Sequence, residues 1–186
     1  MEKFRNKYRV NSARLQGYDY GKAGAYFITI CVKDNLHCFG KVIEKDNFCS
    51  VKLTELGLIA EENFKKIALL HPYALTDQFI VMPNHVHGII AILDEQNATE
   101  QNNVSRLSTY KNTFGPQRKN IPSIIRGYKS SVKSYALKNN ILFEWQSGYY
   151  DRVIRDHTEL EKIQQYILEN PLKWTFEKDN TQNLFI

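Results

Sequence analysis

Two histidines one residue apart, in the run Pro83-Asn84-His85-Val86-His87, are the residues of this chain whose types and spacing best suit metal chemistry. Alternate residues of a β-strand point to the same side, so on a strand the two imidazoles would share a face with about 6 to 7 Å of rise between them. Two nitrogen donors at that spacing can reach one metal ion. The same pattern also arises by chance in strands, so it indicates a metal site only together with other residues.

Tyr166 and Asn170 form a second pair, four residues apart in a segment that favours a helix. On a helix such residues stack on one face, with their Cβ atoms roughly 5–6 Å apart. A free phenol has a pKa of about 10 and is a poor nucleophile at neutral pH. A metal ion that acts as a Lewis acid on phosphate oxygens offsets this weakness. The two pairs together predict a metal-assisted tyrosine nucleophile.

The basic residues are concentrated in two stretches, although the formal net charge of the chain is only +5. Between Glu100 and Glu144 the sequence contains no Asp or Glu, whereas Lys and Arg recur throughout. The first 24 residues are also basic, with aromatic residues among the cations: Phe4, Tyr8, Tyr18 and Tyr20. Cationic and aromatic side chains in one arm suit phosphates and unstacked bases. A solvated basic surface is the alternative interpretation of the same charge pattern.

We expect one domain over residues 1–186, because 42% hydrophobic residues in a chain of this length suit a single core. Its basic N-terminal arm would be 1–24, a flexible polar loop 94–120 and a C-terminal tail 175–186. No apolar run of signal-peptide or membrane-span length occurs, which favours a cytoplasmic protein without membrane contact. The three cysteines include no C-x-x-C pair, which indicates reduced thiols rather than a disulfide framework or a zinc site.

Hydrophobic periodicity predicts the elements that would position these residues. It predicts strands at 25–32, 38–44, 48–53, 75–82, 85–93 and 141–146. It predicts helices at 54–70, 121–138 and 156–169. Thr54 would cap the first helix and Pro171 would lie just beyond the last. Pro83-Asn84 forms the turn before the strand 85–93, whose two faces are both largely apolar and therefore at least partly covered.

Two runs of the sequence resemble a known family. Pro83-Asn84-His85-Val86-His87 resembles the His-hydrophobic-His motif of the HUH single-tyrosine transposases. The run from Trp145 to Arg155, followed by Tyr166-Ile-x-x-Asn170-Pro171-x-Lys173-Trp174, is similar to their domesticated branch, the REP-associated tyrosine transposases. The resemblance extends from about Gly17 to Trp174, apart from the loop after Leu93.

The resemblance implies an α+β, ferredoxin-like fold in which helices pack on one face of a small antiparallel β-sheet. It implies that His85, His87 and Asn170 bind a divalent metal. It also implies that Tyr166 attacks a DNA phosphodiester, giving a 5′-phosphotyrosine and a free 3′-hydroxyl. Mixed nitrogen and oxygen ligands suit Mg²⁺ or Mn²⁺, with Zn²⁺ as a tetrahedral alternative. Mobile members of the superfamily often carry glutamine where this chain has Asn170.

The implied partner is single-stranded or hairpin DNA, cleaved and rejoined by a monomer or homodimer near repeat sequences that form hairpins. Candidate DNA contacts lie in the basic arm, in the central basic tract and in the run after Gly148. Arg126, Lys129 and Lys133 fall at i, i+3 and i+7 of a predicted helix and form a basic stripe. The full set of candidates is Arg5, Lys7, Arg9, Arg14, Arg126, Lys129, Lys133, Tyr149, Arg152 and Arg155.

Three alternatives stay open at this point. Tyr149 and Tyr150 are rival nucleophiles because they follow Gly148 and could reach a ligand, although neither has a helical amide or carboxylate four residues on. The whole protein could be a DNA-binding module that keeps the fold and no longer cleaves. A metal hydrolase of small phosphoesters is disfavoured, because the basic tract exceeds what one small anion needs. The intact His, His, Tyr and Asn set favours the enzyme.

Overall fold

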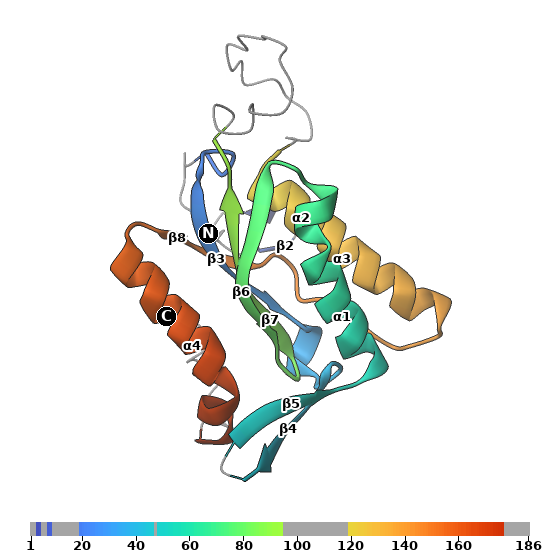
Figure 1. Cartoon of the computed structure of the whole chain (residues 1–186). Coiled ribbons are helices and arrows are strands. Elements are labelled where there is room, and N and C mark those ends of the chain that lie inside the picture. Colours follow the sequence, from blue (N-terminus) through green and yellow to red (C-terminus); the bar gives the residue numbers. More distant parts are fainter. Residues whose placement is uncertain (1–2, 5–6, 9–18, 47, 95–118, 177–186) are drawn as a thin grey trace.

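A four-stranded antiparallel sheet forms the centre of the computed structural model, which describes residues 3–4, 7–8, 19–46, 48–94 and 119–176 (Figure 1). The strand order is β6-β7-β3-β8, with the bounds Ala74–Val81, His85–Ile92, Gly24–Cys31 and Tyr150–Ile154. The central strands β3 and β7 are buried along most of their length. The sheet therefore separates two hydrophobic cores.

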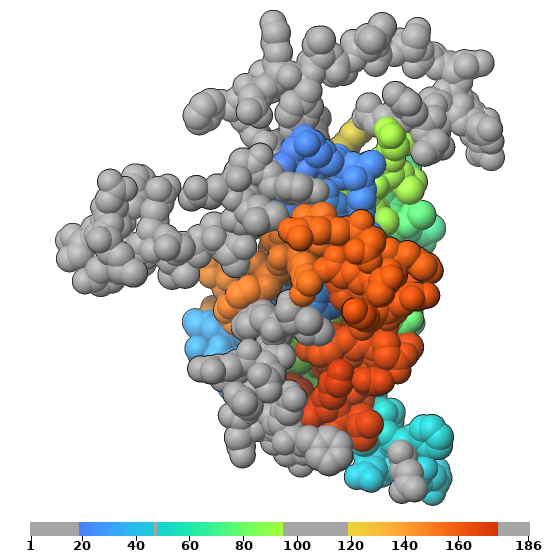
Figure 2. Space-filling model, turned by 90° about the vertical axis from the view of Figure 1, so that its left-hand side faces the viewer, coloured from blue at the N-terminus to red at the C-terminus, as the bar shows by residue number. Residues whose placement is uncertain are grey.

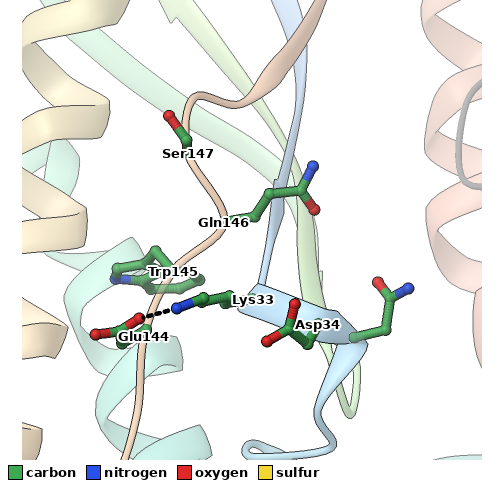
Figure 3. A pocket seen from close by; sticks show the side chains of 7 residues that line it. Lys33, Asp34, Glu144, Trp145, Gln146 and Ser147 are labelled. Atoms are coloured by element: carbon green, nitrogen blue, oxygen red, sulfur yellow. Dashed lines mark hydrogen bonds and ion pairs between the residues drawn. The ribbon is translucent and has the colours of Figure 1, made fainter. Parts of the chain in front are cut away.

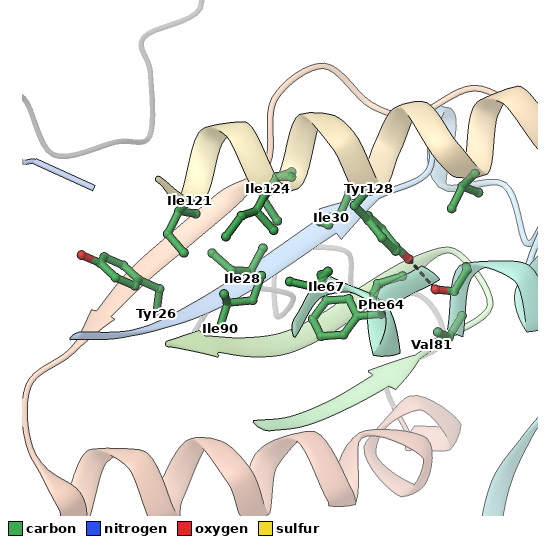
Figure 4. Packing of buried hydrophobic residues seen from close by; sticks show 14 of the residues in the cluster. Tyr26, Ile28, Ile30, Phe64, Ile67, Val81, Ile90, Ile121, Ile124 and Tyr128 are labelled. Atoms are coloured by element: carbon green, nitrogen blue, oxygen red, sulfur yellow. Dashed lines mark hydrogen bonds between the residues drawn. The ribbon is translucent and has the colours of Figure 1, made fainter. Parts of the chain in front are cut away.

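Helices cover both faces of the sheet. Their bounds are Glu55–Lys65 for α1, Ile67–Leu70 for α2, Ile121–Lys138 for α3 and His157–Phe176 for α4. The larger core lies between the sheet and α1 to α3, where Ile28 and Ile30 of β3 meet Phe64, Ile124 and Tyr128 (Figure 4). This core includes the apolar positions that give the predicted helices 54–70 and 121–138 their periodicity.

Helix α4 covers the opposite face. There Phe27 of β3 and Ile89 of β7 pack against Ile163 and Ile167. Figure 4 shows the sheet between α3 and α4, and Figure 2 shows α4, in orange and red, across one side of the molecule. The predicted α+β class with a small antiparallel sheet is confirmed. The helices do not all share one face, however, because β3 and β7 are apolar on both sides and each side needs a covering layer.

Two glycines allow close approaches that the sequence did not predict. A Cβ atom on Gly57, in the first turn of α1, would lie 2.0 Å from the carbonyl oxygen of Phe39. A Cβ atom on Gly88 of β7 would lie 2.3 Å from the ring of Phe64. Gly57 therefore lets α1 begin against the preceding chain, and Gly88 lets the tip of an aromatic ring approach the central strand.

Three predicted elements differ from the structure. Residues 141–146 form an extended segment with only an isolated bridge from Trp145 to Val32, and the strand is instead β8, paired with β3. The helix expected at 54–70 divides at Lys66 into α1 and α2. Helix α4 continues past Pro171, which lacks the N–H that would bond to the carbonyl of Ile167, and takes in two residues of the predicted tail.

The remaining elements lie outside the central sheet. Strands β4 (Gly40–Lys45) and β5 (Phe48–Leu53) form a hairpin of their own, and β1 (Lys3–Phe4) pairs with β2 (Lys7–Tyr8). The three cysteines are free thiols, as predicted. None of the helices described is long and apolar enough to cross a membrane. Most of the predicted arm and loop, including Arg5, Arg9, Arg14 and 95–118, lies outside the described residues.

Candidate active site

The turn at Pro83-Asn84 fixes the start of β7 from two sides. The N–H of Met82 donates to the carbonyl of His85 at 2.8 Å and closes the turn. The carbonyl of Asn84 accepts from Val32 at 2.7 Å, and the carbonyl of Pro83 accepts from Phe39 at 3.0 Å. His85 is therefore the first residue of a strand whose position is set by β3 and by the chain before α1.

His85 and His87 lie on the α4 side of β7, with their ring centroids 4.4 Å apart, and both are fully buried. Each ring is held through Nδ1: Oδ1 of Asn84 lies 2.7 Å from His85, and Oγ1 of Thr29 lies 2.9 Å from His87. The Nε2 atom of each ring has no hydrogen-bond partner among the described residues. Buried nitrogens without partners are costly, and two of them side by side fit a bound metal ion.

Burial also sets the charge state of the two rings. It lowers the pKa of His85 to about 3, against a smaller opposite effect from the carboxamide of Asn170. It holds the pKa of His87 well below its ordinary value, and the neighbouring His85 lowers it further. Both imidazoles are therefore neutral at physiological pH, which is the form that binds metals.

Helix α4 brings the second predicted pair to the same place. The ring of Tyr166 lies 5.4 Å from that of His87, and Phe27 contacts both rings. Asn170 is 6% exposed and lies one turn further along the helix. Asp156 caps the start of α4 by accepting from the N–H of Glu159 at 2.8 Å. All four residues predicted from the sequence are thus brought together.

Few side chains near the histidine pair are available as further metal ligands. Among the described residues, no group of three or more His, Cys, Asp or Glu side chains is suited to hold a metal ion. A site at this pair would therefore take its third protein donor from the carboxamide oxygen of Asn170. Two imidazoles and one amide form a mixed set of nitrogen and oxygen donors, which suits Mg²⁺, Mn²⁺ or Zn²⁺.

Lys173 is a further residue of the site to which the sequence analysis gave no role. Its Nζ lies 4.9 Å from the centroid of the Tyr166 ring and 3.3 Å from Oε2 of Glu169. The signal in the sequence is its spacing, because residues 166, 170 and 173 lie on one face of a helix. Its ammonium group places positive charge beside the phenol.

The rival tyrosines, Tyr149 and Tyr150, lie at the start of β8, and β3 separates that strand from β7. Thr29 is paired with His87 on one side and with Tyr150 on the other, so Tyr150 is two strands from β7, roughly 10 Å at about 4.8 Å per strand. The hydroxyl of Tyr150 accepts from Nε2 of Gln146 at 3.3 Å. Tyr149 packs against the core on the other face of the sheet. Neither of them makes the ring contact with His87 that Tyr166 makes.

Two lysines of the basic stripe on α3 hold the segment before β8. Nζ of Lys129 donates to the carbonyls of Gln146 and Gly148, each at 2.7 Å, and burial lowers its pKa. Lys133 donates to the carbonyl of Phe143. Arg126, by contrast, is exposed. Lys129 and Lys133 therefore have structural roles that charge patterning did not predict.

Two further candidate DNA contacts, Arg152 and Arg155, lie near the start of α4. Arg152 pairs with Glu159 at 2.7 Å, and the Arg155 side chain is exposed. Lys7 is described only through its backbone in β2. The described candidates therefore lie on both sides of the sheet, with Arg126 on α3 and the other two arginines near the start of α4.

An open hollow of about 470 Å³ lies beside the turn at Pro83-Asn84 (Figure 3). It is lined by Lys33, Asp34, Asn35 and residues 144–147, and an ion pair between Lys33 and Glu144 crosses it at 2.6 Å. Asp34 and Asn35 belong to the short 3-10 turn Lys33–Asn35 and have φ angles of 55° and 54°. The carbonyl of Asn35 accepts from Nδ2 of Asn84 at 3.4 Å, which connects this hollow to the histidine pair.

Comparisons with known proteins find proteins similar to this chain in sequence. No family model matches the chain. An uncharacterized protein of Haemophilus influenzae is 35% identical over 164 residues, which cover 88% of each chain. A second protein of that organism, named as a REP-associated tyrosine transposase, is 24% identical over 155 residues, or 83% of this chain and 74% of its own. The chain is thus similar in sequence to a protein named as a REP-associated tyrosine transposase.

The fold of this chain is also found among solved structures. A REP-associated tyrosine transposase bound to a REP hairpin matches with a TM-score of 0.54 and 16% sequence identity, over 100% of this chain and 89% of that one. At this identity the match shows a shared fold. It confirms the α+β architecture predicted for this chain.

Proposed function

We propose that the protein is a metal-dependent endonuclease and transposase that cleaves and rejoins single-stranded DNA through a 5′-phosphotyrosine on Tyr166. One observation carries the proposal. The Tyr166 ring lies 5.4 Å from the ring of His87, beside two buried Nε2 atoms that have no hydrogen-bond partner among the described residues. A nucleophile and a pair of metal ligands in contact are what such a reaction requires.

His85, His87 and Asn170 would hold the divalent ion, Mg²⁺ or Mn²⁺. When bound, the ion supplies Lewis-acid stabilisation of negative charge on phosphate oxygens. Thr29 and Asn84 support the two rings through Nδ1, so that both Nε2 atoms are available.

In the proposed cleavage step, Oη of Tyr166 forms a bond to phosphorus, and the bond between phosphorus and the 3′-oxygen breaks. The phenol loses one proton and the 3′-oxygen gains one, so the charge is balanced. Attack of a 3′-hydroxyl on the phosphotyrosine reverses the step and rejoins the strand. Lys173, 4.9 Å from the ring, would attract the phosphate to the phenol.

Hairpin-forming repeat DNA is the proposed substrate. The relative with a solved structure binds a REP hairpin, and this chain shares its fold. The exposed side chains of Arg126 and Arg155 and the basic N-terminal arm would contact phosphates, and stacking on aromatic residues would favour unpaired bases. We propose that the protein acts as a monomer or homodimer in the cytoplasm.

The test is formation of a covalent adduct with a labelled DNA hairpin that carries a single-stranded flank. The wild type should form an adduct that survives denaturing electrophoresis with Mg²⁺ or Mn²⁺, and none with a chelator. Tyr166→Phe should form no adduct while its affinity for the hairpin stays within about twofold, because only the attacking oxygen is lost. Tyr149→Phe and Tyr150→Phe are the matched controls and should retain the adduct. An adduct formed by Tyr166→Phe would place the nucleophile elsewhere.

The same experiment separates the enzyme from a catalytically silent DNA-binding protein. A silent protein binds the hairpin but forms no adduct with any divalent metal. Asn170→Gln adds information, since mobile members of the superfamily often have glutamine here. It should retain part of the activity if this amide is a metal ligand, whereas Asn170→Ala should lose metal binding and cleavage together.

A further inference from the structure

Asn84 connects the turn before β7 to the imidazole of His85. Its side chain is 5% exposed, and its Oδ1 lies 2.7 Å from Nδ1 of the ring. A carboxamide oxygen can only accept a hydrogen bond, so in a neutral ring Nδ1 must carry the proton and Nε2 the lone pair. A metal ion binds the unprotonated nitrogen, and Nε2 is the buried atom left without a partner among the described residues.

The orientation of this carboxamide is itself determined. Nδ2 of Asn84 donates to the carbonyl of Asn35 at 3.4 Å. Turning the amide over would place Oδ1 against that carbonyl, so two acceptors would face each other. The main-chain carbonyl of Asn84 accepts from Val32 at 2.7 Å, which fixes the backbone from which the side chain extends. Asn84 therefore presents an acceptor to His85 in one arrangement only.

Thr29 plays a different part for His87. It lies directly opposite His87 in the register of β3 and β7, and its Oγ1 is 2.9 Å from Nδ1. A hydroxyl both donates and accepts, so this bond is compatible with either tautomer of His87. The two histidines of the pair thus differ: one has a partner that determines its tautomer, and the other has a partner that does not.

We propose that Asn84 is a positioning residue that holds His85 in the Nδ1-protonated tautomer before any metal binds, whereas Thr29 lets His87 exchange between tautomers until the metal selects one. The inference deepens the proposed function, because it rests on His85 and His87 as metal ligands. It assigns Asn84 the task of keeping one ligand ready, which lowers the cost of binding the ion.

The first test needs neither metal nor DNA. In metal-free protein labelled with ¹⁵N-histidine, two-bond ¹H–¹⁵N spectra distinguish protonated from unprotonated ring nitrogens, and the chain has only five histidines to assign. His85 should show a single Nδ1-protonated state, and His87 should show averaged signals that become Nδ1-protonated when Mg²⁺ is added. A wild-type His85 with its proton on Nε2, or a mixture, would overturn the proposal whatever the variants show.

The second test uses substitutions at Asn84. Asn84→Ala keeps the main-chain bond to Val32, so the strand should still form, but His85 should become a mixture of tautomers and Mn²⁺ affinity should fall by about 10- to 100-fold. Asn84→Asp keeps an acceptor and should restore the Nδ1-protonated state, measured at pH 8. Asn63→Ala, which removes a half-buried carboxamide from α1, is the matched control and should change neither reading.

The two proposals fail separately. If Asn84→Ala leaves His85 purely Nδ1-protonated with unchanged Mn²⁺ affinity, Asn84 has no positioning role, even where adduct formation is normal. If the wild type and variants show the expected tautomers but no Mn²⁺ or Mg²⁺ binds to any of them, the assignment to Asn84 is supported while the proposed metal site is wrong. If Asn84→Ala does not fold, the wild-type and Asn84→Asp spectra still decide the tautomer.

Discussion

The rings of His87 and Tyr166 lie 5.4 Å apart, centroid to centroid, with their planes inclined at 63°. One residue lies on a central strand and the other on a helix that follows far along the chain. Phe27 joins them, because it stacks on His87 at 5.2 Å and meets Tyr166 edge-on at 6.1 Å. The geometry of the candidate site therefore depends on a core residue that has no chemistry of its own.

Replacing this residue should uncouple the nucleophile from the metal ligands. We expect Phe27→Leu to lower the free energy of unfolding by about 1 to 3 kcal/mol and to slow adduct formation at least tenfold in protein that is still folded. Phe143→Leu, in the core on the other face, removes an equally buried ring and is the matched control. Urea denaturation and single-turnover adduct assays make the comparison. Equal loss of adduct in both variants would mean that stability alone is responsible.

Substituting alanine for Gly88 and for Gly127 should change the stability of the protein in opposite directions. A Cβ atom on Gly88 would lie 2.3 Å from the ring of Phe64 in the core, whereas one on Gly127 of α3 has nothing within 4 Å. Gly88→Ala should therefore destabilise the protein by about 1 to 3 kcal/mol through overpacking. Gly127→Ala should stabilise it by about 0.5 to 1 kcal/mol, because alanine costs less than glycine to order in a helix. Thermal denaturation of the two variants decides this, and a shift of the same sign in both would contradict the packing described.

The arrangement of the candidate site could be predicted from the sequence because its parts are local patterns. The two-residue spacing of His85 and His87 on a strand and the four-residue spacing of Tyr166 and Asn170 on a helix each define a face. A turn at Pro83-Asn84 fixes where the strand begins. These patterns did not predict which face of the sheet α4 would cover, because β7 is apolar on both sides.

The elements that were missed depend on contacts between distant segments. In β8, Asp151 and Arg152 interrupt the apolar pattern, and the strand exists because β3 offers an edge to pair with. Helix α4 tolerates Pro171 because packing on the sheet offsets one lost hydrogen bond. The charge spacing predicted a basic stripe on α3. It did not predict the extended segment whose carbonyls Lys129 and Lys133 bind.

Lys129 and Arg126 lie one turn apart on α3. Substitutions at these two positions should separate an effect on stability from an effect on DNA binding. Lys129→Met keeps the aliphatic chain but removes two hydrogen bonds, to the carbonyls of half-buried Gln146 and exposed Gly148, so it should cost about 1 to 3 kcal/mol of stability. Arg126→Ala should leave stability within about 0.5 kcal/mol, because its side chain is exposed. If Arg126 contacts a phosphate, this variant should also reduce the logarithmic salt slope for single strands by about 0.7. Denaturation and hairpin titrations at several salt concentrations are the measurements.

The buried histidine pair should make the metal-free protein sensitive to acid. Burial lowers the pKa of His85 to about 3 and that of His87 well below 6.5, whereas in the unfolded chain both take up protons near pH 6.5. Below that pH the unfolded state binds more protons than the folded state, so the stability that the neutral rings contribute is fully present above pH 6.5 and is lost as pH falls toward 3. Two such groups give a slope approaching about 2.7 kcal/mol per pH unit, from about 1.36 for each. Urea denaturation in a chelator from pH 8 to pH 5 measures it. A double variant with His85→Gln and His87→Gln should flatten this slope. A double variant with the wild-type slope would assign the acid sensitivity to other groups.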